Sequence, residues 1–147
     1  MKMSVDELEK LYQKIGACIW HVQCLENALH TLLALKVDVK LPGQIPEDEA
    51  LESLAKHRRA TLGTALSVAN RHASLSAELL SELKLIKEER DWLVHRLVHQ
   101  DGEDIDSGVG RIRVLSRLDE LMEKTLSVKK QVINEVSRYC AIFGVFD

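Results

Sequence analysis

An arginine, an acidic residue and a histidine stand close together in the segment Arg90-Asp91-Trp92-Leu93-Val94-His95. Arginine carries a fixed positive charge and a planar fork of donors that fits a phosphate group. Histidine can give or take a proton near neutral pH. These side chains could bind and cut a phosphodiester, or they could form a structural ion pair beside an exposed histidine at a helix end. The residue types alone leave both interpretations open.

The segment falls in a helix predicted over residues 75–99, on which Arg90 shares a face with apolar residues. That face contains Leu79, Leu83, Ile86, Leu93 and Leu97. An arginine that points into a core needs a partner, because a buried unpaired charge is very costly. Glu26, beside the leucine seam of the predicted first helix, is the expected partner. Replacing Glu26 by glutamine is then expected to lower the melting temperature.

Asp91, His95 and His99 follow one another at four-residue steps, so they form a polar row on the other side of the same helix. Asp91 can accept a hydrogen bond from His95 and favour its charged form. The two histidines could also hold zinc at this spacing. Because no further ligand is evident beyond Asp91, we predict a solvated polar row and no metal. Arg96 lies beside it.

An ideal helix separates Arg90 and His95 by about 140°, too far for both to grip one phosphate. Either the arginine curls around the helix, or the site is composite and is completed by a second chain at a two-fold interface. Trp92 and Trp20 are both expected to point away from their own core, which indicates a covered partner surface. We therefore expect a homodimer with both tryptophans at its interface.

The rest of the chain predicts helices throughout. It has 147 residues, 46% of them hydrophobic, and only 2 prolines and 7 glycines. Apolar residues recur at helical steps nearly everywhere, so we predict a single all-α domain over residues 1–147. The architecture expected is an elongated up-and-down bundle of four main helices and one short helix. The predicted main helices are 5–35, 47–58, 75–99 and 111–143, and the short helix is 64–70. The residues of helix 111–143 that are expected to face the core are Leu115, Leu118, Met122, Leu126, Ile133, Val136 and Cys140.

Composition and motifs exclude several classes of function. There is no run long enough to span a bilayer and no secretory leader, so we expect a cytoplasmic protein that does not engage membranes. Three cysteines without a disulfide or zinc pattern indicate reduced thiols. The net charge of −3 argues against a general nucleic-acid coat but not against a local basic site. No glycine-rich phosphate loop or acyl-transfer triad stands out, and no cofactor is expected.

The segment Arg90–His95 resembles the motif of HEPN domains, an arginine followed four to six residues later by a histidine. In that family the residue after the arginine is often Asn, Asp or His. Thr61-Leu62-Gly63 ahead of a short helix, and a long first helix that carries Leu25-Glu26, also resemble the layout of HEPN groups. The predicted order of helices resembles that of HEPN domains over most of the chain, whereas the motif itself covers only about six residues.

This resemblance implies a homodimer with both motifs at its interface and, in active members, RNA cleavage without a metal ion. Arg90 and His95 then match the catalytic pair and Asp91 its polar neighbour. The RNA 2′-hydroxyl would serve as nucleophile. Such ribonucleases act as toxins or in defence, so a protein or nucleotidyltransferase-type antitoxin is an expected partner. The competing interpretation is a non-catalytic helical module that dimerises and binds other proteins.

Further basic residues could extend an RNA surface. Arg96 and His99 flank the motif, while Arg111 and Arg113 follow an acidic loop predicted over residues 101–110. These last two could line an RNA path or simply balance that loop. The cluster Lys56-His57-Arg58-Arg59 could contact phosphates or cap the end of its helix.

Overall fold

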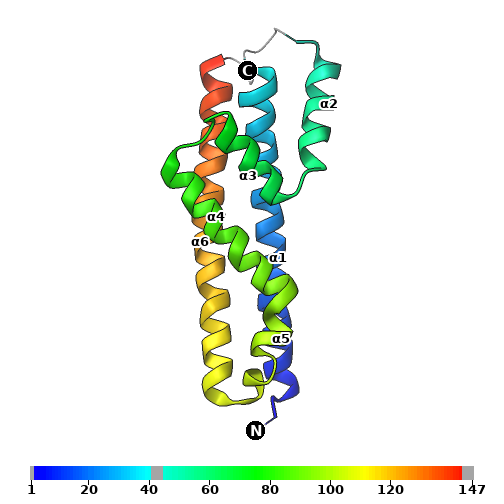
Figure 1. Cartoon of the computed structure of the whole chain (residues 1–147). Coiled ribbons are helices and arrows are strands. Elements are labelled where there is room, and N and C mark those ends of the chain that lie inside the picture. The colour runs from blue at the N-terminus through cyan, green and yellow to red at the C-terminus, as the bar shows by residue number, and fades with distance from the viewer. Residues whose placement is uncertain (1, 41–44, 144–147) are drawn as a thin grey trace.

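The chain folds into helices, which run alternately up and down the long axis of an elongated bundle (Figure 1). The computed structural model describes residues 2–40 and 45–143. Within these ranges it contains helices and short turns but no β-strand. The predicted all-α fold is therefore confirmed.

The first helix, α1 (Val5–Leu33), begins where the sequence predicts. Ser4 caps it reciprocally: the Ser4 hydroxyl accepts from the Glu7 amide at 3.2 Å, and the Ser4 amide donates to the Glu7 carboxylate at 2.8 Å. The predicted end at residue 35 is wrong, because helical structure continues as a π-helical turn, η1 (Ala34–Val39). Pro42 and Gly43 do not fit a helix interior and therefore predict an end to helical structure, but both lie outside the described ranges.

Helix α2 (Glu47–Arg58) matches its predicted bounds and packs on η1. Asp38 of η1 accepts hydrogen bonds from His57 at 2.8 Å and from Ser53 at 2.5 Å. Burial tends to raise the pKa of Asp38, but these two donors hold it below its ordinary value. His57 is buried in this pair. The expectation that it could contact RNA phosphates is therefore wrong, whereas its neighbours at the exposed end of α2 remain open to solvent.

Helix α3 (Leu62–Arg71) starts earlier than predicted, because the Thr61 hydroxyl caps it by accepting from the Thr64 amide at 3.2 Å. Leu62 and Gly63, which the sequence places ahead of this helix, therefore belong to its first turn. Helix α4 (Ala77–Asp91) begins two residues later than predicted, because Ser76 caps it by accepting from the Leu79 amide at 3.1 Å.

The long helix predicted over residues 75–99 is interrupted by a π-helical turn, η2 (Trp92–Arg96), and resumes as α5 (Leu97–Asp101). The Leu97 amide donates to the Trp92 carbonyl, five residues back. A turn closed over five residues holds one more residue than an α-helical turn. That extra residue allows Trp92, Leu93 and Leu97 all to be buried.

A short 3₁₀ turn, η3 (Asp104–Asp106), leads into the last helix, α6 (Gly108–Phe143). The expected loop over residues 101–110 is therefore more ordered than predicted, and the last helix begins three residues early. Gly110 makes this possible, because a Cβ atom there would lie 2.1 Å from the Asp104 carbonyl oxygen. Only glycine tolerates so close a backbone approach.

Helices α1 and α6 lie side by side and run in the same direction, while α4 runs back across one face of the pair (Figure 1). The core lies between these three helices and α3. The buried side chains of α6 are those of Val114, Leu118, Leu121, Thr125, Val128, Val132 and Cys140, of which Leu118 and Cys140 belong to the predicted seam. Two members of the predicted seam, Leu126 and Ile133, are instead 40% and 45% exposed. The helix carries two adjacent apolar stripes, and periodicity does not tell which one faces the core.

Candidate functional site

The motif residues lie where α4 passes into the π turn. Arg90 and Asp91 form the end of α4, and His95 belongs to η2. The angle of about 140° expected between Arg90 and His95 assumed a straight α-helix. A π turn closes over five residues, so it brings residues five apart towards the same side. By this geometry, the angle between Arg90 and His95 is smaller than in a straight α-helix. Such turns occur often at functional sites.

Arg90 reaches two carboxylates from different helices. Its Nε lies 3.3 Å from Glu26 Oε1 on α1, and its Nη1 lies 3.7 Å from Asp91 Oδ1. The predicted partnership with Glu26 is confirmed. The Glu26 oxygen is buried without a hydrogen bond, so the contact is electrostatic and poorly aligned. Burial raises the pKa of Glu26, and the charge of Arg90 offsets part of that rise. Within the described structure, the guanidinium donors of Arg90 make no hydrogen bond, and its side chain is 34% exposed.

Asp91 is held by a lysine one turn earlier and not by the histidine after it. Lys87 Nζ donates to Asp91 Oδ2 at 2.9 Å. This hydrogen bond does most to lower the pKa of Asp91, and the charges of Lys87, Arg90 and His95 add to the effect. The expected hydrogen bond from His95 to Asp91 is not formed, because the π turn breaks the four-residue step between them. Asp91 nevertheless lies within electrostatic reach of both Arg90 and His95.

Trp92 is buried, with 1% of its surface exposed, so the prediction that it points outward to a dimer interface is wrong. Its indole Nε1 donates to Asp101 at 2.8 Å. The guanidinium of Arg117 lies over its ring, 3.8 Å from the centroid. Arg117 also donates twice to Glu89, at 2.7 and 2.8 Å. Trp92 is therefore part of the structural joint between α4, α5 and α6. Trp20, by contrast, is exposed as predicted.

His95 is exposed, and so are Arg96 and His99 on either side of it. In the part of the chain that the structure describes, none of these three side chains forms an ion pair or hydrogen bond. Two exposed valines accompany them: Val94 is 47% and Val98 is 80% exposed. The surface around His95 thus combines unpaired proton-transferring and basic groups with apolar side chains.

The two arginines after the acidic loop are already engaged. Arg111 donates to Glu7 at 2.8 Å and to the Ile105 carbonyl at 3.0 Å. Arg113 pairs with Asp104. These contacts match the interpretation in which they balance the loop, and we leave both arginines out of the candidate site.

Sequence reasoning missed Lys87, Val94 and Val98 as members of this surface, and Arg117, Glu89 and Asp101 as its support. The lysine could have been found from its four-residue spacing to Asp91. The contact between Glu89 and Arg117 joins residues of two different helices, so the sequence around either residue does not predict it.

Within residues 2–40 and 45–143, no three His, Cys, Asp or Glu side chains are grouped so as to hold a metal ion. Among the described helices, none is both long enough and apolar enough to cross a bilayer. Comparisons with models of protein families, with curated proteins and with solved structures found no match. The likeness to HEPN domains therefore rests on the motif and on the helical layout.

Proposed function

We propose that this protein is a HEPN-like endoribonuclease that cuts RNA without a metal ion, at a composite site formed where two copies pair through residues 90–99. One observation carries the proposal. A π turn that contains His95 follows directly on Arg90 and Asp91, and the winding of such a turn favours residues five apart on one side; the guanidinium donors of Arg90 form no hydrogen bond within the described structure. A cation with available donors beside an exposed imidazole is suited to a phosphodiester.

The chemistry needs one base, one acid and one stabilising cation. The RNA 2′-hydroxyl attacks the adjacent phosphorus while His95 of one copy accepts its proton. The bond to the 5′-oxygen breaks, and His95 of the second copy protonates that leaving group. The products are a 2′,3′-cyclic phosphate and a 5′-hydroxyl. Arg90 stabilises the charge that builds on the phosphorus-bound oxygens. Asp91 positions Arg90 and Lys87 through the contacts described above.

The exposed valines support pairing at this surface. Val94 and Val98 are four residues apart and flank His95. Apolar side chains grouped around polar ones are typical of a protein interface. Packing these valines against their copies would bring the two His95 side chains into one groove, as a two-fold site requires.

The test is an RNA cleavage assay in EDTA with the wild type, His95→Ala and His72→Ala. His72 is an exposed histidine just after α3, so it is a matched control. We expect the wild type and His72→Ala to cleave RNA, and His95→Ala to lose about 10²- to 10⁴-fold in rate, the usual contribution of a general acid or base. Circular dichroism checks that both variants fold. If the wild type does not cleave RNA, or if His95→Ala cleaves it as fast, the nuclease proposal is wrong.

A second candidate, a non-catalytic helical binding module, has one observation in its favour. Glu26 and Asp91 both lie against Arg90, which fits a purely structural arginine. On that view Val98→Asp would disrupt association but no RNA cleavage would be seen with any variant. On the nuclease view the same substitution lowers the molecular mass and the cleavage rate together.

A further inference from the structure

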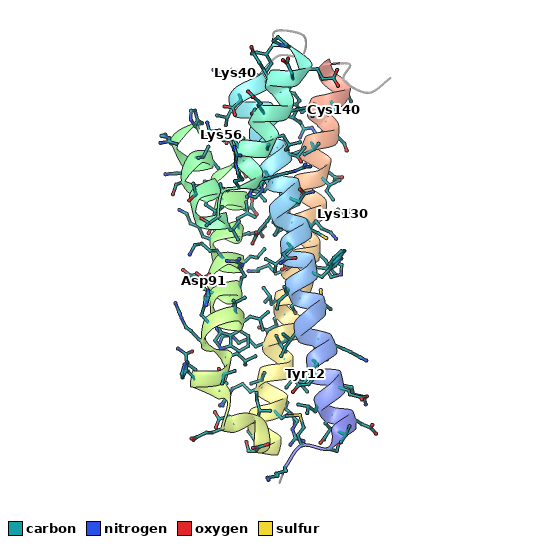
Figure 2. All side chains as sticks on the ribbon, turned by 90° about the vertical axis from the view of Figure 1, so that its right-hand side faces the viewer. Tyr12, Lys40, Lys56, Asp91, Lys130 and Cys140 are labelled. Atoms are coloured by element: carbon teal, nitrogen blue, oxygen red, sulfur yellow. The ribbon has the colours of Figure 1, made fainter. Side chains whose placement is uncertain are left out.

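One face of the α1/α6 pair is left open. Helices α3 and α4 pack on the other face, and none of the described helices lies over this one (Figures 1 and 2). Figure 2 shows Lys130 of α6 on the opposite side of the bundle from Asp91 of α4. The open face is thus separate from the candidate nuclease site, and the inference drawn from it does not rest on the proposed function.

This open face is apolar along its centre. Trp20 of α1 is 65% exposed, and Leu126 and Ile133 of α6 are 40% and 45% exposed. Two grooves lie between the helices, one before and one after Leu126 along α6. The first, of about 370 Å³, is lined by Ala17 and Met122 and by the ion pair of Lys14 with Asp119, among others. The other, of about 450 Å³, is lined by Cys24, Ala28, Ile133 and Val136 among others. An indole and two grooves left open to water favour a protein partner.

The charges beside this stripe change sign along α6. Glu123 precedes Leu126 on one edge of the stripe, whereas Lys130 follows it. Asp119 is already paired with Lys14, and Lys124 lies about 100° around the helix from Glu123. Glu123 and Lys130 are both exposed and stand seven residues apart, so they lie on one edge of the helix, two turns from each other. In the described structure neither forms an ion pair. Leu126 lies between them.

We infer that the occupant of this face is a second copy of the same chain, with its α6 antiparallel to the first and the two-fold axis near Leu126. In that arrangement Glu123 of each copy meets Lys130 of the other. The two stripes pack together, and Trp20 covers their side. Because the two α6 helices are antiparallel, the groove before Leu126 in one copy faces the groove after Leu126 in the other copy.

The charge order selects this direction. In a parallel two-fold pair each residue lies near its own copy, so Glu123 would face Glu123 and Lys130 would face Lys130. In the antiparallel pair every such contact joins opposite charges. Charged residues that flank an apolar helix seam fix the orientation of a pair in this way.

The experiment measures molecular mass by light scattering during gel filtration for the wild type, Glu123→Lys, Lys130→Glu and the double exchange. Each single variant places like charges together at both ends of the seam, so we expect its mass to be half that of the wild type. The double exchange restores opposite charges, and its mass should return to the wild-type value. If the surface around His95 also associates, each copy carries two interfaces and larger assemblies form, so the same four proteins are then compared in a Val98→Asp background, where only the α6 interface is left and the factor of two is expected.

Three outcomes would overturn the inference: a monomeric wild type, a mass unchanged in both single variants, or a double exchange whose mass does not return to the wild-type value.

Disulfide cross-linking tests the same pairing independently. Leu126→Cys in a Cys24→Ser background should form a covalent dimer on oxidation, since the two thiols lie near the axis. Ile112→Cys in the same background is the control, because it is 68% exposed on the same helix but far from the axis. Equal cross-linking of both cysteines would contradict a defined pairing.

Discussion

Arg90 and Arg117 both lie against carboxylates, yet the structure holds them in different ways. Arg117 makes two hydrogen bonds to Glu89 and covers the ring of Trp92. The bond to Glu89 does most to raise the pKa of Arg117. Arg90 lies 3.3 and 3.7 Å from its two carboxylates without an aligned hydrogen bond. The donors of Arg117 are used within the chain, while those of Arg90 are available to a ligand.

This difference arises although Glu89 and Arg90 are neighbours in sequence. Successive residues of a helix point about 100° apart, so Glu89 faces α6 and Arg90 faces α1. An arginine that makes two aligned hydrogen bonds to one carboxylate stabilises the joint between helices. An arginine held only by opposite charge can exchange a carboxylate for a phosphate.

The largest effect is expected at the ring beneath Arg117. Trp92→Ala removes a fully buried indole and leaves its Asp101 partner unpaired, which should cost about 3–5 kcal/mol of unfolding free energy. For a chain of this size that corresponds to a melting temperature lower by roughly 10 °C. Thermal unfolding followed by circular dichroism measures it. Trp20→Ala is the control, and an equal loss there would mean that burial does not distinguish the two tryptophans.

The next effect compares the arginines directly. Arg90→Ala should reduce the rate of RNA cleavage by about 10²- to 10³-fold, the effect of removing one charge-stabilising donor group. Its melting temperature at pH 7 should also fall, because Glu26 loses the charge that offsets its burial, but no hydrogen bond is lost with the Arg90 side chain. Arg117→Ala should lower stability by about 1–2 kcal/mol while the folded enzyme retains activity. Cleavage rates and melting curves are measured for both variants. If only Arg90→Ala loses stability, Arg90 is the structural arginine and the comparison is wrong.

The smallest effect concerns the carboxylate beside Arg90. Burial raises the pKa of Glu26 above its ordinary 4.5, so the folded protein holds a proton there more readily than the unfolded chain does. Stability from this group is therefore greatest below about pH 4.5 and falls as the pH rises through the folded-state pKa. Glu26→Gln cannot ionise, so its melting temperature relative to the wild type should rise between pH 4 and 7.

This expectation revises the one drawn from the sequence, which is a lower melting temperature for Glu26→Gln. The revision follows from the buried Glu26 oxygen, which gains charge attraction from Arg90 but no hydrogen bond. Melting curves at pH 4, 5, 6 and 7 decide between the two. A clear loss of stability at pH 7 in the glutamine variant would show that the ion pair outweighs the burial of its charge.

Much of the fold is readable from local sequence. The capping box at Ser4 and Glu7, the bounds of α2 and the apolar repeat of α1 all follow from interactions between residues close in the chain. The partnership of Glu26 with Arg90 was also predictable, since a charge on an apolar face needs an opposite charge nearby. The predicted seam of α6 is right at Leu118 and Cys140 but wrong at Leu126 and Ile133, because both stripes of the helix have the same period and only packing against α1 and α4 decides which is covered.

The candidate site divides in the same way. The sequence by itself determined an all-helical chain and the residue types at Arg90, Asp91 and His95, because side-chain chemistry and helical periodicity are local properties. Tertiary structure alone decided that Trp92 turns inward under Arg117, that a π turn accommodates it, and that Arg90 is left with open donors. Burying the ring of Trp92 against α6 can change the local helix from α to π geometry. Because α6 comes later in the chain, the residues around Trp92 do not predict this contact.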